Sequence, residues 1–193
     1  MCKKLIYLAS FVLVMGLVLS SVANAAALPG LIGWYKLDEM VGTTAFDSSG
    51  LGNDGHFGPE GDPQWVAGYF GGAVDLDGSD DYIEINSIAD DIPTDNNFSV
   101  MAWIKTTQTG DGNVIGANTT GSSHDFIFGV DQNVLLVEAD TINRYPPIIN
   151  DGVWHHIAYV RNGNNAYAYT DGVLVGTETP SGDPSAMARW SIG

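Results

Sequence analysis

The chain has 193 residues and a formal net charge of −16, with 23 acidic residues against seven basic ones and a single cysteine. Such an acidic surface argues against nucleic acid and anionic membranes as partners, whereas calcium and cationic partners suit it. A charge that serves only solubility is the alternative.

The first residues have the layout of a secretory signal peptide. Lys3 and Lys4 precede an apolar run from Leu5 to Leu19, and Ala23-Asn24-Ala25 supplies a small-residue cleavage pattern. We therefore predict a signal-peptide helix over residues 1–25, cleavage near Ala25 and a secreted location, extracellular or periplasmic. The run is shorter than the ~20 apolar residues of a membrane-spanning helix, so we expect no stable membrane insertion after cleavage.

Cleavage would leave 168 residues, enough for one domain with a sizeable core. Losing Lys3 and Lys4 leaves five basic residues against 23 acidic ones, a net charge of −18. The cysteine is lost too, so burial or a metal ion must stabilise the exported domain in place of disulfides. We predict a short lead-in over residues 26–30 and one domain over residues 31–193.

Short β-type runs separated by turn residues follow one another along this domain. From Phe98 to Lys105, alternate residues share one face, which leaves Trp103 on the other. The pairs Asn162-Gly163 and Asp171-Gly172 favour tight hairpins, because their residues accept positive φ. The predicted strands cover residues 32–37, 73–76, 82–85, 98–105, 125–130, 134–138, 154–161, 166–170 and 173–177. This spacing predicts an all-β antiparallel sandwich or barrel.

Five segments carry a family resemblance. They are LIGWYKLDE at 31–39, DSSGLGNDG at 47–55, GYFGGAVDLDGSDDYI at 68–83, FSVMAWIK at 98–105, and WHHIA at 154–158 followed by YTDG at 169–172. In this order they resemble the laminin-G-like jelly-roll domain of the concanavalin-A-like lectin/glucanase superfamily. The resemblance implies a two-sheet antiparallel jelly roll with a non-catalytic recognition role.

The resemblance also implies one further strand after Ser191-Ile192-Gly193, paired beside the first strand at 31–37. We therefore expect one or more C-terminal strands to be missing and the chain to be a fragment of a longer product. An incomplete domain is the alternative. Either case would leave an unpaired edge that invites aggregation or completion by another chain.

Catalysis finds little support in the sequence. Retaining glucanases of this superfamily need two carboxyl groups about 5 Å apart, carried as E-x-D-x-x-E. The nearest match runs from Glu138 to Asn143 and has an amide where the acid should stand. His155 and His156 are neighbours on a strand, so they point to opposite faces and cannot easily share a metal ion. We predict no enzyme and no catalytic residues, with one histidine hydrogen-bonded inward and the other outward.

Calcium fits the acidic motifs better, because it prefers carboxylate, amide and carbonyl oxygens. The loop at 47–55 offers Asp47, Asn53 and Asp54, and the resemblance to calcium-dependent lectin-like proteins adds Asp125. We predict a calcium site on these four residues. Turn capping by Asp47 and Asn53 through their own backbone is the alternative. The segment from Asp75 to Asp80 is interpreted as a hairpin, because its glycine and final acidic residue do not fit an EF-hand.

Sugar recognition needs an exposed aromatic platform. Trp103, on the outer, concave side, and Tyr169 are candidates for stacking on a sugar ring, although Trp103 packed under a long loop is an equal alternative. Candidate ligand loops cover residues 106–113, 118–124 and 140–151. We predict an extracellular module that binds carbohydrate or a surface protein and is stabilised by calcium. A purely structural adhesion module of a larger surface protein and a degenerate glycoside hydrolase are the alternatives.

Overall fold

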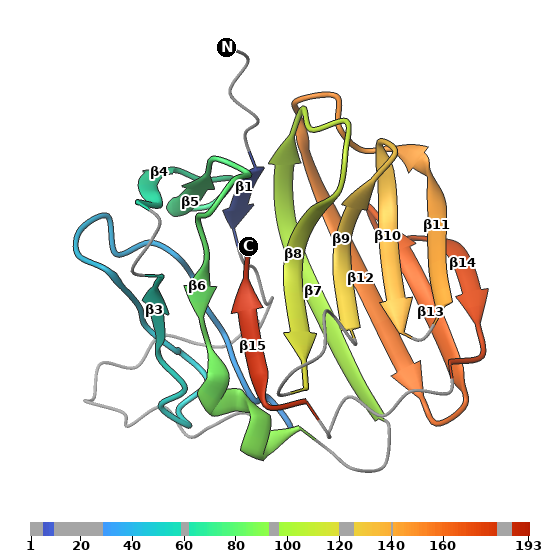
Figure 1. Ribbon diagram of the computed structural model, residues 1–193, viewed down its shortest axis with the longest axis horizontal. Coiled ribbons are helices and arrows are strands. Elements are labelled where there is room, and N and C mark those ends of the chain that lie inside the picture. The colour runs from blue at the N-terminus through green and yellow to red at the C-terminus, as the bar shows by residue number, and fades with distance from the viewer. Residues whose placement is uncertain are drawn as a thin grey trace, which may run out of the picture.

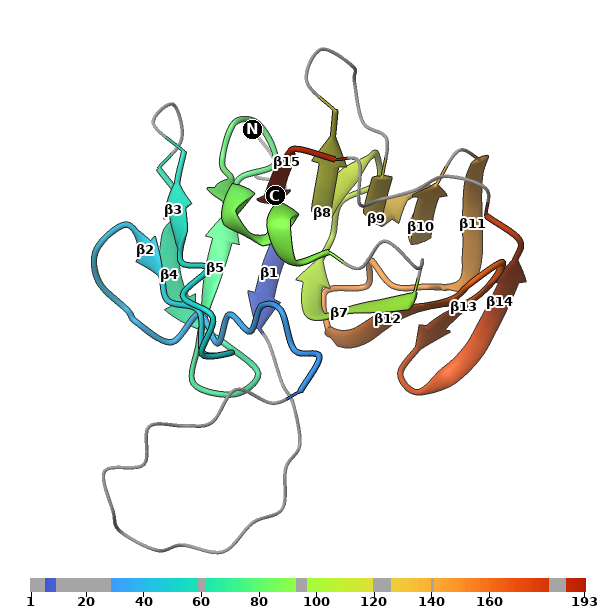
Figure 2. The ribbon, with the colours of Figure 1, turned by 90° about the horizontal axis from the view of Figure 1, so that it is seen from below.

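The computed structural model describes residues 6–9, 29–58, 62–92, 97–119, 126–139, 141–180 and 187–193. These residues form two antiparallel β-sheets that face each other (Figure 1), and Figure 2 shows the two layers edge-on. The predicted all-β jelly-roll sandwich is thereby confirmed. Within the described ranges, no helix is long and apolar enough to cross a membrane.

One sheet has seven strands in the order β14-β13-β12-β7-β1-β5-β4. In chain order these are β1 (Ile6–Ala9), β4 (Gln64–Ala67), β5 (Gly72–Leu76), β7 (Asn97–Thr106), β12 (Trp154–Asn162), β13 (Asn165–Thr170) and β14 (Val173–Glu178). The predicted strands at 73–76, 98–105, 154–161, 166–170 and 173–177 all lie in this sheet.

The other sheet has eight strands in the order β11-β10-β9-β8-β15-β6-β3-β2. They are β2 (Thr44–Ala45), β3 (Gly55–Phe57), β6 (Ile83–Glu84), β8 (Gly112–Asn118), β9 (Phe126–Asp131), β10 (Val134–Ala139), β11 (Thr141–Ile148) and β15 (Arg189–Ile192). A 3₁₀ helix, η1 (Asn86–Asp91), follows β6 and lies beside β15.

The core lies between the two sheets and follows the period-two pattern of the strands. On β7, Ala102 and Ile104 are buried while Met101 is exposed, as the alternation predicts. An aromatic contact joins the layers, since the ring of Phe126 on β9 lies 6.1 Å from that of Tyr159 on β12. Within the eight-stranded sheet, the Phe126 ring lies 6.0 Å from that of Trp190 on β15. The residues that alternate with these core positions therefore point outward and form the outer face of the seven-stranded sheet.

Within the predicted leader, residues 6–9 form a strand and not the expected helix. Residues Ile6–Ala9 form β1, which pairs antiparallel with β5 on one side and β7 on the other. In this register Leu8 is opposite both Val74 and Ile104, and Ile6 is opposite both Leu76 and Thr106. The segment therefore fills the middle of the sheet (Figures 1 and 2).

The predicted strand at 32–37 is wrong. Tyr35 makes only an isolated bridge to Asp47, and the Trp34 N–H donates to the Asp47 carboxylate at 2.9 Å rather than to a neighbouring strand. Leu37 and Met40 then take φ values of 58° and 60°, which an extended strand cannot accommodate. The segment is fastened to the loop at 47–55 instead.

Most of the candidate ligand loop at 140–151 is a strand and not a loop, because β11 occupies residues 141–148. Seven strands have no counterpart among the predicted strands: β1, β2, β3, β4, β8, β11 and β15. Of the proposed loop at 118–124, residues 120–124 lie outside the described residues, as do Asp125 and Asp140.

Candidate functional site

The outer face of the seven-stranded sheet gathers aromatic side chains, and we call it the aromatic face. Residues directly opposite each other in an antiparallel pair share a face. His156 is opposite Trp103, and Tyr169 and Met101 are both opposite Ala158, so β7, β12 and β13 present these residues together. The aromatic face consists of Tyr69, Phe70, Trp103, Trp154, His156, Tyr167 and Tyr169.

The tip of the β4–β5 hairpin covers Trp103. The Tyr69 ring stacks on the Trp103 ring with centroids 4.1 Å apart and an interplanar angle of 15°. Phe70 meets Tyr69 edge-on at 4.6 Å. Tyr69 and Phe70 are each 48% exposed, whereas Trp103 is only partly exposed beneath them. The ring surface that faces solvent here is therefore that of Tyr69 and Phe70.

Glycines fix this tip over the sheet. The Gly68 N–H donates to the Gly71 carbonyl at 3.0 Å, and Gly71 has a φ of 64°. A Cβ at Gly68 would lie 2.1 Å from the Gly72 carbonyl oxygen, so only glycine fits there. Two adjacent aromatic residues in a glycine-bounded turn indicate exposed rings. This Gly-Tyr-Phe-Gly segment was part of the family resemblance, but no role was predicted for it.

The two predicted sugar-stacking residues lie on this face but do not touch each other in the sheet. Trp103 is on β7 and packs under Tyr69. This arrangement corresponds to the alternative in which a loop covers Trp103. Tyr169 is on β13, and the β12 residue Ala158 lies between it and β7. Both remain candidates for ligand contact.

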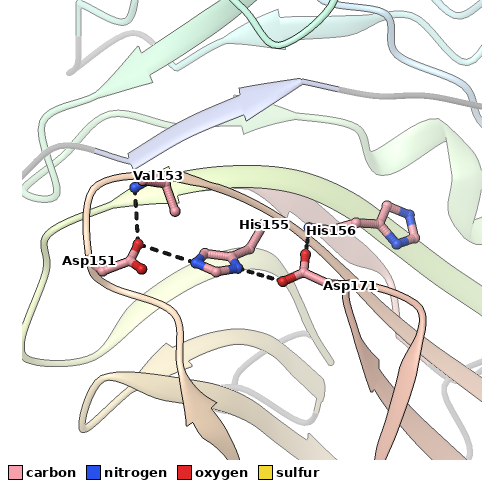
Figure 3. A network of polar contacts seen from close by, with 5 residues as sticks. All are labelled: Asp151, Val153, His155, His156 and Asp171. Atoms are coloured by element: carbon pink, nitrogen blue, oxygen red, sulfur yellow. Dashed lines mark hydrogen bonds and ion pairs between the residues drawn. The ribbon is translucent and has the colours of Figure 1, made fainter.

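His155 anchors the start of β12 beside the aromatic face (Figure 3). Its Nδ1 lies 2.8 Å from an Asp171 oxygen and its Nε2 lies 3.2 Å from an Asp151 oxygen. The other Asp171 oxygen accepts the His156 N–H at 2.9 Å, and Asp151 accepts the Val153 N–H at 3.0 Å. Burial alone would lower the pKa of His155, but the hydrogen bonds to Asp171 and Asp151 outweigh it and raise that pKa.

The histidine pair therefore has the predicted arrangement, with His155 hydrogen-bonded and His156 on the outer face. The His156 ring lies 5.4 Å from that of Trp103, and burial lowers its pKa, against an opposing effect of Asp171. With both His155 nitrogens directed at carboxylates, the network holds the turns at 151–153 and 171–172 in place.

The structure brings Asp47, Asn53 and Asp54 into one loop, with Asp47 at its centre. One Asp47 oxygen accepts the N–H groups of Trp34 and Ser49, and the other accepts the Ser49 hydroxyl and the Asn53 N–H, at 2.6–3.0 Å. Partial burial raises the pKa of Asp47, but these hydrogen bonds outweigh it and hold the pKa below its usual range.

This loop leaves Asp47 little room to bind a cation. A carboxylate has about four lone-pair sites, and four donors occupy those of Asp47. The Asn53 amide donates to the Ile32 carbonyl and to Asp91, and Asp54 accepts the Asp47 N–H. Oxygens for a metal ion could come from Asn53, Asp54 and backbone carbonyls, but not from Asp47 unless the loop opened.

A second acidic group lies in the hairpin at 77–81. Carboxylate oxygens of Asp77, Asp80 and Asp81 lie within 4.8 Å of one another. The buried Asp81 accepts the N–H groups of Asp62 and Asp77 at 2.7 and 2.9 Å, which folds the hairpin. The sequence predicts only a hairpin here, because the segment does not match an EF-hand and no sequence pattern shows that its carboxylates converge.

The hairpin borders a polar hollow of about 660 Å³, which we call the acidic hollow. Asp80 and Asp81 line it together with Asp111, just before β8, and Glu138 on β10. Hydrogen bonding to Asp131 raises the pKa of Asp111, whereas Arg144 opposes that shift. Convergent carboxylates of this kind are the ligands that calcium prefers.

A match to a protein-family model shows which family the chain belongs to. The laminin-G family model, described as concanavalin A-like lectin/glucanases superfamily, matches residues 77–193, more than half of the chain. The chain belongs to this superfamily. The resemblance inferred from the five sequence segments is therefore confirmed.

A solved structure has a similar fold. Domain 4 of AbnA, a GH43 extracellular arabinanase from Geobacillus stearothermophilus, solved in complex with arabinotriose, is similar with a TM-score of 0.61, 21% identity and 76% of each chain covered. Domains LG4-5 of the mouse laminin alpha1 chain match with a TM-score of 0.42 and 14% identity, over 53% of this chain and 29% of that one. A search of curated proteins found no match to the sequence.

Some members of this superfamily are glucanases, so the arrangement of the acidic segment at 138–143 matters. Glu138 on β10 is opposite Ile142 on β11, while Asn143 is opposite the core residue Val137. Glu138 and Asn143 therefore point to opposite faces of the sheet. The Asn143 amide donates to Glu178, whereas Glu138 lines the acidic hollow. The segment forms a hairpin in which its two ends do not meet.

Proposed function

We propose that this laminin-G-like domain is a non-catalytic extracellular recognition module that binds carbohydrate on its aromatic face. The single observation that carries the proposal is the stack of Tyr69 on Trp103, which presents half-exposed rings on a rigid sheet. The apolar C–H faces of a sugar ring fit such rings, and nearby polar groups orient the hydroxyls.

The surroundings of the stack support a carbohydrate ligand. Trp154 lies 6.3 Å from Tyr69, which extends the apolar surface along β12. Lys105 and Asp171 stand near its edges and supply a donor and acceptors. The similar arabinanase domain was solved with arabinotriose, and this supports testing neutral oligosaccharides first.

A non-catalytic role agrees with the position of Glu138, whose expected partner, Asn143, is an amide on the opposite face. The degenerate glycoside hydrolase is the competing hypothesis. Release of reducing ends from a β-glucan, lost on Glu138→Gln, would support it. The predicted signal peptide supports an extracellular site of action, and N-terminal sequencing of the exported protein tests it.

The first experiment is binding of arabinotriose and a panel of oligosaccharides, measured by calorimetry. Tyr69→Ala and Phe70→Ala should each weaken binding of the best ligand about tenfold, since a stacked ring contributes on the order of 1–2 kcal/mol. Phe46→Ala is the matched control, because Phe46 is an exposed aromatic (56%) outside the aromatic face. Its affinity should equal that of the wild type.

Two results would count against the proposal. Equal affinities for wild type, Tyr69→Ala and Phe70→Ala would place the sugar elsewhere. No binding across the panel by the folded protein would favour the purely structural adhesion module instead.

We also propose that calcium stabilises the domain, and that it binds in the acidic hollow. Asp80 and Asp81 line the hollow, and their oxygens converge with that of the neighbouring Asp77, as the hard-oxygen preference of calcium requires. The loop at 47–55 is the less suitable place, because Asp47 accepts four hydrogen bonds. In the hairpin at 77–81, Asp81 accepts two backbone N–H groups and Asp77 accepts one, so these carboxylates keep more acceptor sites.

A further inference from the structure

Arg189 on β15 is an exposed guanidinium that has no hydrogen-bond or ion-pair partner among the described residues. Lys36 and Arg144 each pair with a carboxylate, and Arg161 donates to backbone carbonyls. The chain carries a net charge of −16, so carboxylates are plentiful on its surface. A guanidinium that nevertheless pairs with none of them is free to bind an anionic group from outside the chain.

Arg189 borders a hollow of about 400 Å³ on the outer face of the eight-stranded sheet, and we call this hollow the Arg189 pocket. Strands β6, β15 and β8 lie side by side there (Figure 1). Trp190 and Ile192 are buried in the core, so Arg189 and Ser191 point outward. Asn118 on β8 is opposite Arg189 and shares this face. The volume lies within the range of about 300–1,000 Å³ that is typical of small-molecule sites.

Polar groups in the pocket stand ready for hydrogen bonding. Asn86 donates to one oxygen of Glu84 at 2.5 Å and accepts the Trp190 N–H at 2.8 Å, which fixes the Glu84 carboxylate against β15. The side chains of Asn118 and Tyr82 line the pocket and have no hydrogen-bond partner among the described residues. A positioned carboxylate, an amide and a phenolic hydroxyl therefore surround the same hollow as the guanidinium.

Gly116 leaves the floor of the pocket without a side chain. It is opposite Ser191, which in turn is opposite Glu84, so the three lie in one row across the sheet. A Cβ at Gly116 would lie 3.7 Å from the nearest atoms, which are in the Asn113 and Ser191 side chains, so the fold does not require glycine there. A glycine inside a strand lets a ligand approach the backbone closely.

We propose that the Arg189 pocket binds a sugar that carries a single carboxylate, such as a hexuronate. The planar fork of Arg189 holds a carboxylate with two parallel N–H bonds. Ring hydroxyls donate to Glu84 and pair with Asn118 and Tyr82. Glu84 and the net charge of the chain repel ligands with several negative charges, so the pocket selects one carboxylate among hydroxyls.

A peptide is the less suitable ligand. Strands β6, β15 and β8 each pair on both sides, so the pocket offers no open strand edge to which a peptide backbone could add. The pocket lies on the other sheet from the aromatic face, so the proposal does not depend on sugar binding there.

The test is a titration of the ¹⁵N-labelled full chain, followed by NMR at the Arg189 Nε–Hε group. The probes are D-glucuronate and D-galacturonate, each compared with the neutral sugar that has CH₂OH in place of the carboxylate. At least one acid should shift this resonance saturably and bind about tenfold or more tightly than its neutral counterpart in about 20 mM NaCl. The advantage should shrink towards about 200 mM NaCl. No saturable shift with either acid would overturn the proposal.

Two variants locate the ligand. Arg189→Gln should remove the advantage of the acid over the neutral sugar, whereas Lys36→Gln should keep it, because Lys36 is a half-exposed cation paired with Asp38 outside the pocket. Gly116→Gln should weaken binding of the acid about tenfold, because its side chain fills the floor. An acid that binds Arg189→Gln as tightly as the wild type would refute the assignment of the guanidinium.

Two further measurements separate this site from the alternatives. Tyr69→Ala should leave binding of the acid unchanged; a loss there, with binding kept in Arg189→Gln, would place the acid on the aromatic face and overturn the proposal. Acetyl-Gly-Gly presents a carboxylate without ring hydroxyls and should bind about tenfold more weakly than the acidic sugar. Equal binding of this peptide would show that the pocket recognises a carboxylate alone, and the sugar would be wrong.

Discussion

At the start of β12, His155 provides a titratable link between two turns. Hydrogen bonds to Asp171 and Asp151 raise its pKa above the ordinary value of 6.5. A histidine whose pKa is raised on folding stabilises the protein fully below its unfolded pKa, and this stabilisation is lost as the pH rises through the folded pKa. We expect wild type to exceed His155→Gln in melting temperature by roughly 1–3 °C at pH 5.5–6, with the difference shrinking towards pH 8.

His156 supplies the matched control, since burial lowers its pKa while Asp171 partly opposes the effect. Its contribution to stability is present above the unfolded pKa and is lost as the pH falls through the folded value. The melting difference between wild type and His156→Gln should therefore change with pH in the opposite direction. Parallel curves for the two variants would contradict the assignment of Asp171 and Asp151 as partners of His155.

The site could be predicted only in part from residues taken one at a time. The alternation along 98–105 correctly places Trp103 on the outer face, because the period of a strand is a local property. That Tyr69 covers Trp103 depends on a hairpin more than thirty positions earlier in the chain, and no local pattern reports such a contact. The hydrogen bonding of Asp47 could not be predicted from a local pattern either, because its four donors belong to Trp34, Ser49 and Asn53.

At the level of elements, β14 and β11 meet at one open edge of the sandwich, where Gly176 packs against the ring of Tyr145. A Cβ at Gly176 on β14 would lie 2.0 Å from the Tyr145 ring on β11. The Tyr145 hydroxyl donates to Glu178 at 3.3 Å, and the Tyr159 hydroxyl donates to the same carboxylate at 2.8 Å. The Glu178 carboxylate thus joins strands of both sheets.

Gly176→Ala should therefore destabilise the domain by about 1–3 kcal/mol, because Tyr145 must move and its contact with Glu178 is strained. Urea denaturation followed by tryptophan fluorescence measures this. Gly116→Ala on β8 is the control, since the nearest atoms to its Cβ would lie 3.7 Å away and it should cost less than about 1 kcal/mol. Equal losses in both variants would mean that the β11–β14 contact is not the cause.

The strands also show which elements local patterns can predict. β12, β13 and β14 were predicted because Asn-Gly and Asp-Gly turns join alternating runs. β8 and β11 escaped prediction because glycines interrupt the first and Pro146 and Pro147 the second, and prolines are tolerated in β11 because it is an edge strand. The run at 32–37 has strand composition, yet the Asp47 side chain takes the backbone donor that a ladder would need.

For the molecule as a whole, the charge of −16 has to be reconciled with a compact fold. Like charges repel one another, and the acidic hollow concentrates several of them around one volume. Backbone N–H groups stabilise the charge on Asp81, which accepts those of Asp62 and Asp77, and on Asp47, which accepts those of Ser49 and Asn53. A divalent cation in the hollow would remove the remaining repulsion, so the native state should bind calcium more tightly than the unfolded chain.

A thermal melt of the full chain in 10 mM calcium and then in excess EDTA tests this at the scale of the molecule. A site with a dissociation constant of about 0.1–1 mM should raise the melting temperature by about 3–10 °C. Asp80→Asn should abolish the shift with little effect on the melt in EDTA, because Asp80 is an exposed member of the cluster. Asp54→Asn should keep the calcium-induced shift in melting temperature. If the shift is instead lost in Asp54→Asn and kept in Asp80→Asn, calcium occupies the loop at 47–55, as the sequence predicts. A melt of the wild type that is indifferent to calcium would leave the fold intact and remove the metal from both places.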